Sequence, residues 1–298
     1  MAKFLKTKED MKSMLDQFDT ILLDCDGVIW HGNELVPDVK EALEYFRTLK
    51  KDIVFVSNNA TKSRPQYKQK FDKLGIQASE DEIFGSAYAS AVYFSQILKF
   101  PKDKKVFVIG EKGLEDELHS EGINTCGGSD PESNKPLPSQ DFSSIKHDSE
   151  IGAVLCGFDT HINYAKLARA HLALTLDKST EFVITNDDST FPSNGVLYPG
   201  SGSLSAPLRY STGRDPIVVG KPNKSMMDCI VAKRHFDRSR TLMVGDRLNT
   251  DIEFGIKGGT STMLVLTGVN KVDDIESSGT TPSYIVNSLG DFRALAEE

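Results

Sequence analysis

The stretch TILLDCDGVIW, residues 20–30, determines how the rest of the chain is interpreted. Residues 20–24 form a short apolar run that ends in an aspartate and is bounded by a turn at Gly27, which predicts a buried strand. Asp24 and Asp26 stand two positions apart, so on a continuing strand their side chains point to the same side. Their mutual repulsion is costly unless a cation or a proton intervenes.

Beyond this stretch, apolar runs typical of strands alternate with helical patterns. Further strands are predicted at residues 53–56, 83–84, 105–109, 153–155, 182–184, 217–219, 241–244 and 262–266. Helices are predicted near residues 37–49, 64–74, 86–98, 113–121 and 163–176. The stretch 127–149 is rich in Ser, Pro, Asp and Lys and predicts an exposed loop. The alternation predicts an α/β fold in which helices flank parallel sheets.

The strand and helix pattern restarts at about Pro101, which favours a second α/β domain inserted into the first. We expect a Rossmann-like parallel-sheet core domain in two parts, residues 1–100 and 209–298, with the inserted domain at residues 101–208. A chain of 298 residues is long enough to bury the cores of two such domains.

The composition is that of a globular protein without an affinity for polyanions. Hydrophobic residues make up 39%, charged residues 26%, and the net charge is −8, so neither nucleic acid nor a membrane is an expected partner. No apolar run approaches the roughly 20 residues that cross a bilayer. The first 17 residues mix charges and lack a secretory core, so a cytosolic location is expected. In that compartment free thiols are expected at the four cysteines, Cys25, Cys126, Cys156 and Cys229.

Polar residues follow four of the predicted strands, where open parallel sheets bind ligands. These strand ends are Asp24-Cys25-Asp26-Gly27, Ser57-Asn58-Asn59, Gly220-Lys221-Pro222 and Gly245-Asp246-Arg247. Asp246 would complete an oxygen-rich cluster with Asp24 and Asp26, suited to a hard ion such as Mg²⁺. A carboxylate in such a cluster can attack phosphorus, while Ser57 and Lys221 can hold phosphoryl oxygens. Each motif alone is common in turns, so the prediction depends on their occurrence together and in this order.

The ordered set resembles the haloacid dehalogenase superfamily of phosphohydrolases. The matching motifs are DCDGVIW at residues 24–30, VFVSNNATKSR at 54–64, VVGKPNK at 218–224 and VGDRLNTDI at 244–252. The resemblance covers nearly the whole chain and is greatest to the branch that contains 4-nitrophenyl phosphatase, phosphoglycolate phosphatase and pyridoxal phosphate phosphatase. That branch carries a large α/β cap between the second and third motifs, where this chain has its inserted domain.

The resemblance implies roles for the two acids of the first motif and for a metal. Asp24 would be the nucleophile that becomes an aspartyl phosphate. Asp26 would protonate the leaving oxygen and then deprotonate the attacking water. Mg²⁺ would be held by the Asp24 carboxylate, the Asp26 backbone carbonyl and Asp246.

The other motif residues are implied to bind the phosphoryl group of a small phosphorylated substrate. Ser57, the amide of Asn58 and Lys221 would surround that group, with Asn59 nearby. Asp251 would orient Lys221 or metal-bound water without itself contacting the metal or the substrate.

Within the predicted cap, the loop at residues 185–192 is the candidate for substrate specificity, through Asp187 and Phe191. Pyridoxal phosphate enzymes of this branch carry a histidine at the position of Phe191, so the sequence favours 4-nitrophenyl phosphate and small phosphates such as 2-phosphoglycolate as substrates. Relatives are often cap-mediated homodimers, which makes a homodimer a further expectation that no residue here requires.

Three other chemistries share some of these residues. A cysteine phosphatase built on Cys25 would need an arginine six residues on, where this chain has His31. A phospho-receiver domain also uses paired acids and Mg²⁺, but it has no use for a large inserted domain or for an acid at the position of Asp26. A phosphotransferase shares both acids and differs only in what attacks the aspartyl phosphate, so it stays open as an alternative.

Overall fold

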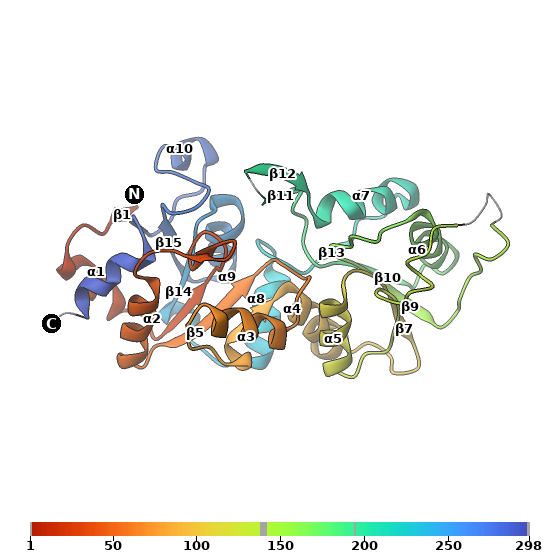
Figure 1. The fold of residues 1–298 in the computed structure, drawn as a ribbon, viewed down its shortest axis with the longest axis horizontal. Coiled ribbons are helices and arrows are strands. Elements are labelled where there is room, and N and C mark those ends of the chain that lie inside the picture. The colour runs from red at the N-terminus through yellow and green to blue at the C-terminus, as the bar shows by residue number, and fades with distance from the viewer. Residues whose placement is uncertain (1, 138–141, 194, 297–298) are drawn as a thin grey trace. The chain divides into compact units, whose positions relative to one another are not determined.

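The computed structural model describes residues 2–137, 142–193 and 195–296 (Figure 1). The described residues group into two compact units, each with its own sheet. The core unit comprises Met1–Ser57, Tyr67–Phe84 and Lys221–Glu298, and the inserted unit comprises Asn58–Gln66 and Gly85–Gly220.

These units divide the chain at positions other than those that the sequence predicts. Residues 58–66 join the inserted unit because Arg64 binds Glu117 there, with Nε 3.0 Å from Oε2. Residues 209–220 join it because Ile217 and Val218 form an edge strand of its sheet.

The core unit is built on a seven-stranded sheet, and the first six strands across it pair in parallel. Across the sheet the strands are β1 (Lys3–Phe4), β16 (Tyr284–Val286), β15 (Ser261–Val265), β14 (Thr241–Gly245), β2 (Thr20–Leu23), β5 (Asp52–Ser57) and β6 (Ile83–Gly85). The central strands β14, β2 and β5 are almost fully buried, as expected for a parallel sheet covered on both faces.

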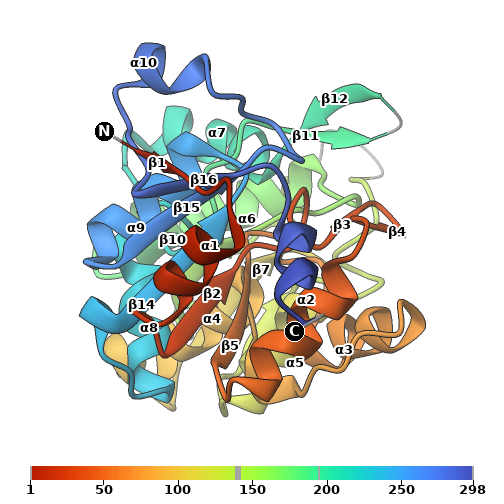
Figure 2. The same cartoon turned by 90° about the vertical axis from the view of Figure 1, so that its left-hand side faces the viewer.

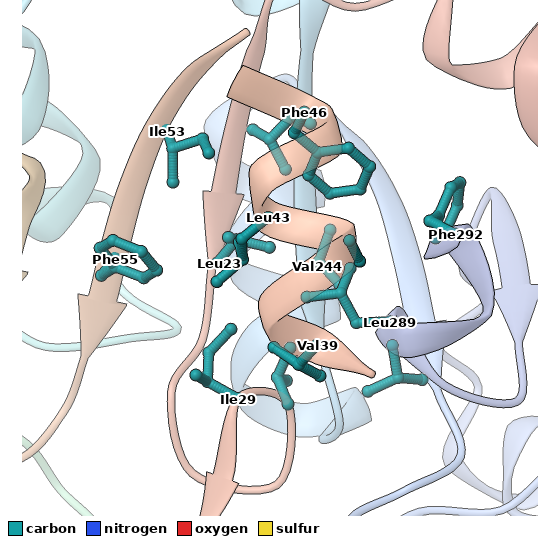
Figure 3. Close-up of a cluster of buried hydrophobic side chains, with 14 of the residues drawn as sticks. Leu23, Ile29, Val39, Leu43, Phe46, Ile53, Phe55, Val244, Leu289 and Phe292 are labelled. Carbon is teal, nitrogen blue, oxygen red and sulfur yellow. The ribbon is translucent and has the colours of Figure 1, made fainter. Parts of the chain in front are cut away.

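One face of this sheet is covered by α1 (Lys8–Leu15), α2 (Val39–Thr48), α3 (Arg64–Lys73) and the C-terminal 3₁₀ helix η5 (Leu289–Leu295). Figure 2 shows α1, α2 and the C-terminal turn in front of the sheet. Figure 3 shows Leu43 and Phe46 of α2 among side chains of β2, β5 and β14. Phe46 meets Phe292 edge to face, with ring centroids 5.4 Å apart, which joins α2 to the C-terminal helix.

The remaining elements of the core unit lie on the other face or between strands. Helix α9 (Glu253–Gly258) packs against β14 and β15, and α8 (Lys224–Lys233) packs against α9. The shorter elements are the hairpin of β3 (Trp30–His31) and β4 (Glu34–Leu35), η1 (Glu80–Glu82), η3 (Arg238–Arg240), the π-helical turn η4 (Leu248–Ile252) and α10 (Asp274–Ser278).

The inserted unit has a second, five-stranded parallel sheet. Its strands in order are β13 (Ile217–Val218), β10 (Glu181–Ile184), β9 (Ile151–Cys156), β7 (Lys105–Ile109) and β8 (Thr125–Gly127). Its helices are α4 (Ser86–Val92) with the π-helical turn η2 (Tyr93–Ile97), α5 (Lys112–Ser120), α6 (Tyr164–Leu176) and α7 (Ser201–Thr212). The strands β11 (Thr190–Ser193) and β12 (Val196–Pro199) form an antiparallel hairpin.

The predicted fold class is confirmed: a parallel-sheet α/β core carries a second α/β unit. The strands predicted at 217–219, 241–244 and 262–266 are present as β13, β14 and β15. Helix α7, which precedes them, was not among the predicted helices. The expected loop at 127–149 includes residues 138–141, which lie outside the described residues. No helix among the described residues is long and apolar enough to span a bilayer.

Candidate active site

Asp24 lies directly after β2, between the neighbouring strands β14 and β5. Its backbone N–H donates to the carbonyl of Val244 at 2.9 Å, which extends the sheet pairing by one residue and fixes the direction of the Asp24 side chain. The side chain is buried, with 8% of the residue exposed. A carboxylate so enclosed needs a nearby compensating charge.

Lys221 supplies that charge, and it is the first residue of the last segment of the core unit. Its Nζ lies 2.5 Å from Oδ1 of Asp24 and 2.8 Å from Oδ1 of Asp251, and it donates to the carbonyl of Val56 at 3.0 Å. Burial opposes the charge on Lys221, but the attraction of the two carboxylates outweighs burial and raises the Lys221 pKa above its ordinary value. The lysine is therefore a fixed ammonium ion beside Asp24.

Asp251 is held in place by the turn that follows β14. Its Oδ2 accepts hydrogen bonds from the backbone N–H groups of Asp246 at 3.2 Å and Arg247 at 3.0 Å, while Oδ1 accepts from Lys221. Both oxygens are thus engaged by protein donors. Asp251 thereby holds Lys221 in place, and its supporting role in the chemistry stays a prediction.

Asp246 is enclosed by backbone. Its Oδ2 accepts from the N–H of Val269 at 2.7 Å, and two glycines approach it closely. A Cβ at Gly27 would lie 2.6 Å from that oxygen and one at Gly268 would lie 2.0 Å from it, and Gly27 also has a positive φ of 89°. Side chains at these two positions would displace the carboxylate, so the glycines are required for Asp246 to occupy this place.

The acidic cluster fits a divalent cation. Oxygens of Asp24, Asp246 and Asp251 lie within 4.8 Å of one another. If all three carboxylates were ionised, they would exceed the one ammonium ion by two negative charges, and burial opposes that ionisation. Burial raises the pKa of Asp24 well above its ordinary value, and burial together with the charge of Asp251 raises that of Asp246 to about 7. An all-oxygen donor set with this excess charge is what Mg²⁺ prefers.

Ser57, at the end of β5, has a partner that the sequence did not reveal. Its hydroxyl lies 3.1 Å from the hydroxyl of Tyr67 in α3, and both side chains are buried. Burial and the nearby charge of Asp26 raise the pKa of Tyr67 well above its ordinary value, so the phenol keeps its proton. Tyr67 therefore restrains the Ser57 hydroxyl in the core unit.

Asn58 and Asn59 follow Ser57 in the chain but belong to the inserted unit. The Asn58 amide donates to Oδ2 of Asp188 at 3.2 Å, and its carbonyl accepts from Asn186 at 2.8 Å. The Asn59 side chain accepts from the N–H of Thr61 at 2.8 Å in an Asx turn. The side chains of both asparagines thus have structural partners in the inserted unit, which the sequence did not predict.

The first motif folds back on itself around Asp26, whose side chain is exposed. Trp30 is fully buried, and its indole donates to Asp26. Burial, followed by the charges of Asp24 and Asp26, raises the pKa of the Cys25 thiol well above its ordinary value. Cys25 therefore stays a thiol, which agrees with its exclusion as a nucleophile.

The two residues proposed for specificity lie in the inserted unit. Asp187 is exposed and forms an ion pair with Arg209 of α7 at 3.0 Å. Phe191 of β11 is half-buried between aromatic rings, with centroids 5.2 Å from Phe158 and 5.9 Å from Tyr198. Neither Arg209 nor the aromatic group was singled out from the sequence, because both depend on the hairpin and on α7.

Comparison with known proteins gives a consistent assignment. Residues 21–124 match the profile described as haloacid dehalogenase-like hydrolase, and residues 218–292 match a second profile described as HAD-hydrolase-like. A 4-nitrophenylphosphatase of Schizosaccharomyces pombe is 47% identical over 97% of this chain and 98% of its own length. Phosphoglycolate phosphatase 1A of Arabidopsis thaliana, a chloroplastic protein, is 41% identical over 95% of this chain and 79% of its own.

The solved structures agree. The p-nitrophenyl phosphatase from Archaeoglobus fulgidus superimposes with a TM-score of 0.78 at 30% identity, covering 93% of this chain and 99% of its own. Because the match covers 93% of the chain, it extends into both units. The chain therefore belongs to the haloacid dehalogenase-like hydrolases, among the phosphatases of that family.

Proposed function

We propose that this protein is a Mg²⁺-dependent phosphomonoester hydrolase that acts through an aspartyl phosphate on Asp24. The observation that carries the proposal is the buried Asp24 carboxylate, 2.5 Å from a fixed ammonium ion and beside two further carboxylates. A lone surface aspartate is a weak nucleophile. One desolvated beside Lys221, where an incoming phosphoryl group also finds positive charge, is suited to attack phosphorus.

The first chemical step forms a bond between an oxygen of Asp24 and phosphorus and breaks the bond from phosphorus to the leaving oxygen. Lys221 and the Ser57 hydroxyl, which Tyr67 restrains, bind the phosphoryl oxygens. Asp26 donates its proton to the leaving oxygen. In the second step Asp26 takes a proton from water as that water attacks phosphorus, and phosphate leaves with Asp24 regenerated.

Mg²⁺ would be held by the Asp24 and Asp246 carboxylates and the backbone carbonyl of Asp26. When bound, the ion supplies positive charge that offsets the repulsion between the Asp24 carboxylate and a phosphate dianion. The residues suit it because the cluster is buried, oxygen-only and in excess negative charge.

The proposed substrates are 4-nitrophenyl phosphate and small phosphometabolites such as 2-phosphoglycolate. The names of the similar proteins support this class. The aromatic group around Phe191 supports it too, since a phenylalanine there cannot donate to or accept from a pyridoxal ring as a histidine can. A cytosolic location and a homodimer stay predictions, and a chloroplastic protein is among the relatives.

The test is a panel of phosphomonoesters incubated with the purified chain and Mg²⁺, with release of inorganic phosphate as the readout. The proposal expects many turnovers on 4-nitrophenyl phosphate and 2-phosphoglycolate, and little on pyridoxal phosphate. Labelling that stops at one phosphoryl group per chain would instead indicate a phospho-receiver. Transfer of the phosphoryl group to an added alcohol in preference to water would indicate a phosphotransferase.

A further inference from the structure

The single tryptophan of the chain makes a specific contact with Asp26. The Nε1–H of Trp30 donates to Oδ1 of Asp26 at 2.9 Å. Trp30 is fully buried, whereas Asp26 is exposed. A buried indole that points its only donor at an exposed carboxylate restricts where that carboxylate can turn.

The turn between the two residues is built to bring them together. The backbone N–H groups of Ile29 and Trp30 both donate to the carbonyl of Cys25, at 2.9 and 3.2 Å. The N–H of Gly27 donates back to the carbonyl of Trp30 at 2.8 Å. Backbone hydrogen bonds therefore hold the segment from Cys25 to Trp30 in a tight turn. This turn places the indole of Trp30 against Asp26, four positions earlier in the chain.

The ring itself is fixed by α3. Phe71 contacts it at a centroid distance of 5.0 Å and an interplanar angle of 63°. The Nζ of Lys70 lies 3.8 Å from the ring centroid, within cation–π distance. With Phe71 and Lys70 packed on it, the indole has little freedom to turn away from Asp26.

We propose that Trp30 is a positioning residue for the acid and base step of Asp26, an inference that rests on the proposed function. Because Oδ1 accepts the indole N–H, Oδ2 is the oxygen left to carry and transfer the proton in this proposal. In the first step the Oδ2–H bond breaks and that proton goes to the leaving oxygen as its bond to phosphorus breaks. In the second step Oδ2 takes one proton from the attacking water, which restores the acid.

This arrangement matters most for leaving groups that need the proton. If Asp26 is misdirected, kcat/KM should fall little when the leaving group is 4-nitrophenolate. It should fall more when the leaving group is the more basic phenolate, although the two rings are similar in size. The role of Trp30 therefore predicts a change in the dependence of kcat/KM on the leaving group, which loss of stability alone would not produce.

The experiment replaces the N–H and keeps the ring. Because Trp30 is the only tryptophan, expression with 3-benzothienylalanine replaces this residue alone, with sulfur in place of N–H, and Trp30→Phe is the genetic counterpart. We expect kcat/KM for phenyl phosphate to fall about tenfold further than kcat/KM for 4-nitrophenyl phosphate, a part of the 10²–10⁴-fold that general acid catalysis typically contributes. Phe46→Leu is the matched control, since it removes a buried ring that packs on Phe292 in the same hydrophobic cluster and leaves Trp30, Phe71 and Lys70 in place.

Asp26→Asn separates the inference from the function on which it rests. If Asp26→Asn steepens the leaving-group dependence and the loss of the indole N–H does not, the role of Trp30 is overturned and the proposed function stands. If Asp26→Asn leaves the dependence unchanged, the proposed acid step itself is wrong. In the double variant, Trp30→Phe is expected to add no further steepening to Asp26→Asn. A steepening of equal size in Phe46→Leu would reduce Trp30 to a packing residue.

Discussion

The Nζ of Lys221 lies 2.5 Å from Oδ1 of Asp24, although the two residues are 197 positions apart in the sequence. The chain runs through the whole inserted unit between them. Asp251 approaches the same ammonium ion at 2.8 Å, and the side chains of all three residues are almost fully enclosed. The ion pair is thus both a structural link within the core unit and the electrostatic centre of the proposed chemistry.

Removing the ammonium ion should destabilise the protein strongly. Lys221→Met leaves Asp24 and Asp251 buried without a cation, so we expect a loss of about 3–5 kcal/mol in the free energy of unfolding. Urea denaturation in the presence of a metal chelator measures it. The matched control is Lys224→Met, which breaks a pair with Asp228 on the surface, where the lysine side chain is 63% exposed. That change should cost about 0–1 kcal/mol. Equal losses in the two variants would contradict the account.

The acidic cluster should make stability depend on pH and on Mg²⁺. Burial, with the charge of Asp251, raises the pKa of Asp246 to about 7, above the ordinary value of 3.8. The folded protein then holds this proton more tightly than the unfolded chain, so the metal-free protein should lose stability as pH rises from about 4 to about 7. Mg²⁺ needs the ionised carboxylate, so its stabilising effect should grow over the same interval.

Thermal denaturation across this pH range, with chelator or with excess Mg²⁺, measures both effects. Asp246→Asn should remove most of the pH dependence and most of the gain from Mg²⁺. Activity should disappear in chelator and return with Mg²⁺, while Ca²⁺ should inhibit because it takes a looser and higher coordination. A Tm at pH 8 that is indifferent to Mg²⁺, together with full activity in excess chelator, would remove the metal from the mechanism.

Specificity should respond to changes in the inserted unit. In the proposed mechanism the groups around Asp24 contact only the phosphoryl end of a substrate, so we expect discrimination between substrates to come from other residues. Phe191→Ala removes the ring between Phe158 and Tyr198. We expect the ratio of kcat/KM between substrates to change by an amount equivalent to roughly 1–3 kcal/mol of transition-state binding, the scale of one apolar pocket contact. Metal dependence should not change.

Competition between 4-nitrophenyl phosphate and 2-phosphoglycolate provides the measurement. Asp187→Asn, which weakens the pair with Arg209, is expected to alter the same ratio. Tyr210→Ala is the control, since that side chain is almost fully exposed on α7 and has no proposed role. A substrate ranking that survives both Asp187→Asn and Phe191→Ala would locate specificity at other residues of the inserted unit.

The sequence predicts the sheets well because their strands are buried on both faces and therefore form continuous apolar runs. It predicts two members of the acidic cluster for a related reason: Asp24 and Asp246 each follow such a run, and parallel strands bring those ends together. The third carboxylate of the cluster is that of Asp251, where the sequence predicts Asp26, whose side chain is exposed. The edge strands β1 and β16, of two and three residues, are too short to give a pattern. Helix α7 is missed because its glycine, serines and Pro207 argue against a helix locally, while packing on the inserted sheet favours one.

The contacts that support the site are harder to predict. Tyr67 gives the ordinary pattern of a helix with an apolar face, and nothing in that pattern pairs its hydroxyl with Ser57. The Trp30 indole could have been predicted only from the closed turn that returns it to Asp26. Likewise, the assignment of Asn58 to the inserted unit follows from its bonds to Asp188 and Asn186, more than a hundred residues away. Such side-chain pairings depend on tertiary placement and leave no periodic signal.

The central claim is that Asp24 is the nucleophile that accepts the phosphoryl group. One measurement tests it most directly. Wild-type protein and Asp24→Asn are each mixed with a labelled phosphomonoester and Mg²⁺, quenched in acid, and assayed for label on the chain and for steady-state release of phosphate. The account predicts acid-stable label on the peptide that contains Asp24 in the wild type. In Asp24→Asn it predicts no label and turnover at background, with a Tm that shows the variant to be folded. Substantial Mg²⁺-dependent turnover by Asp24→Asn would contradict it.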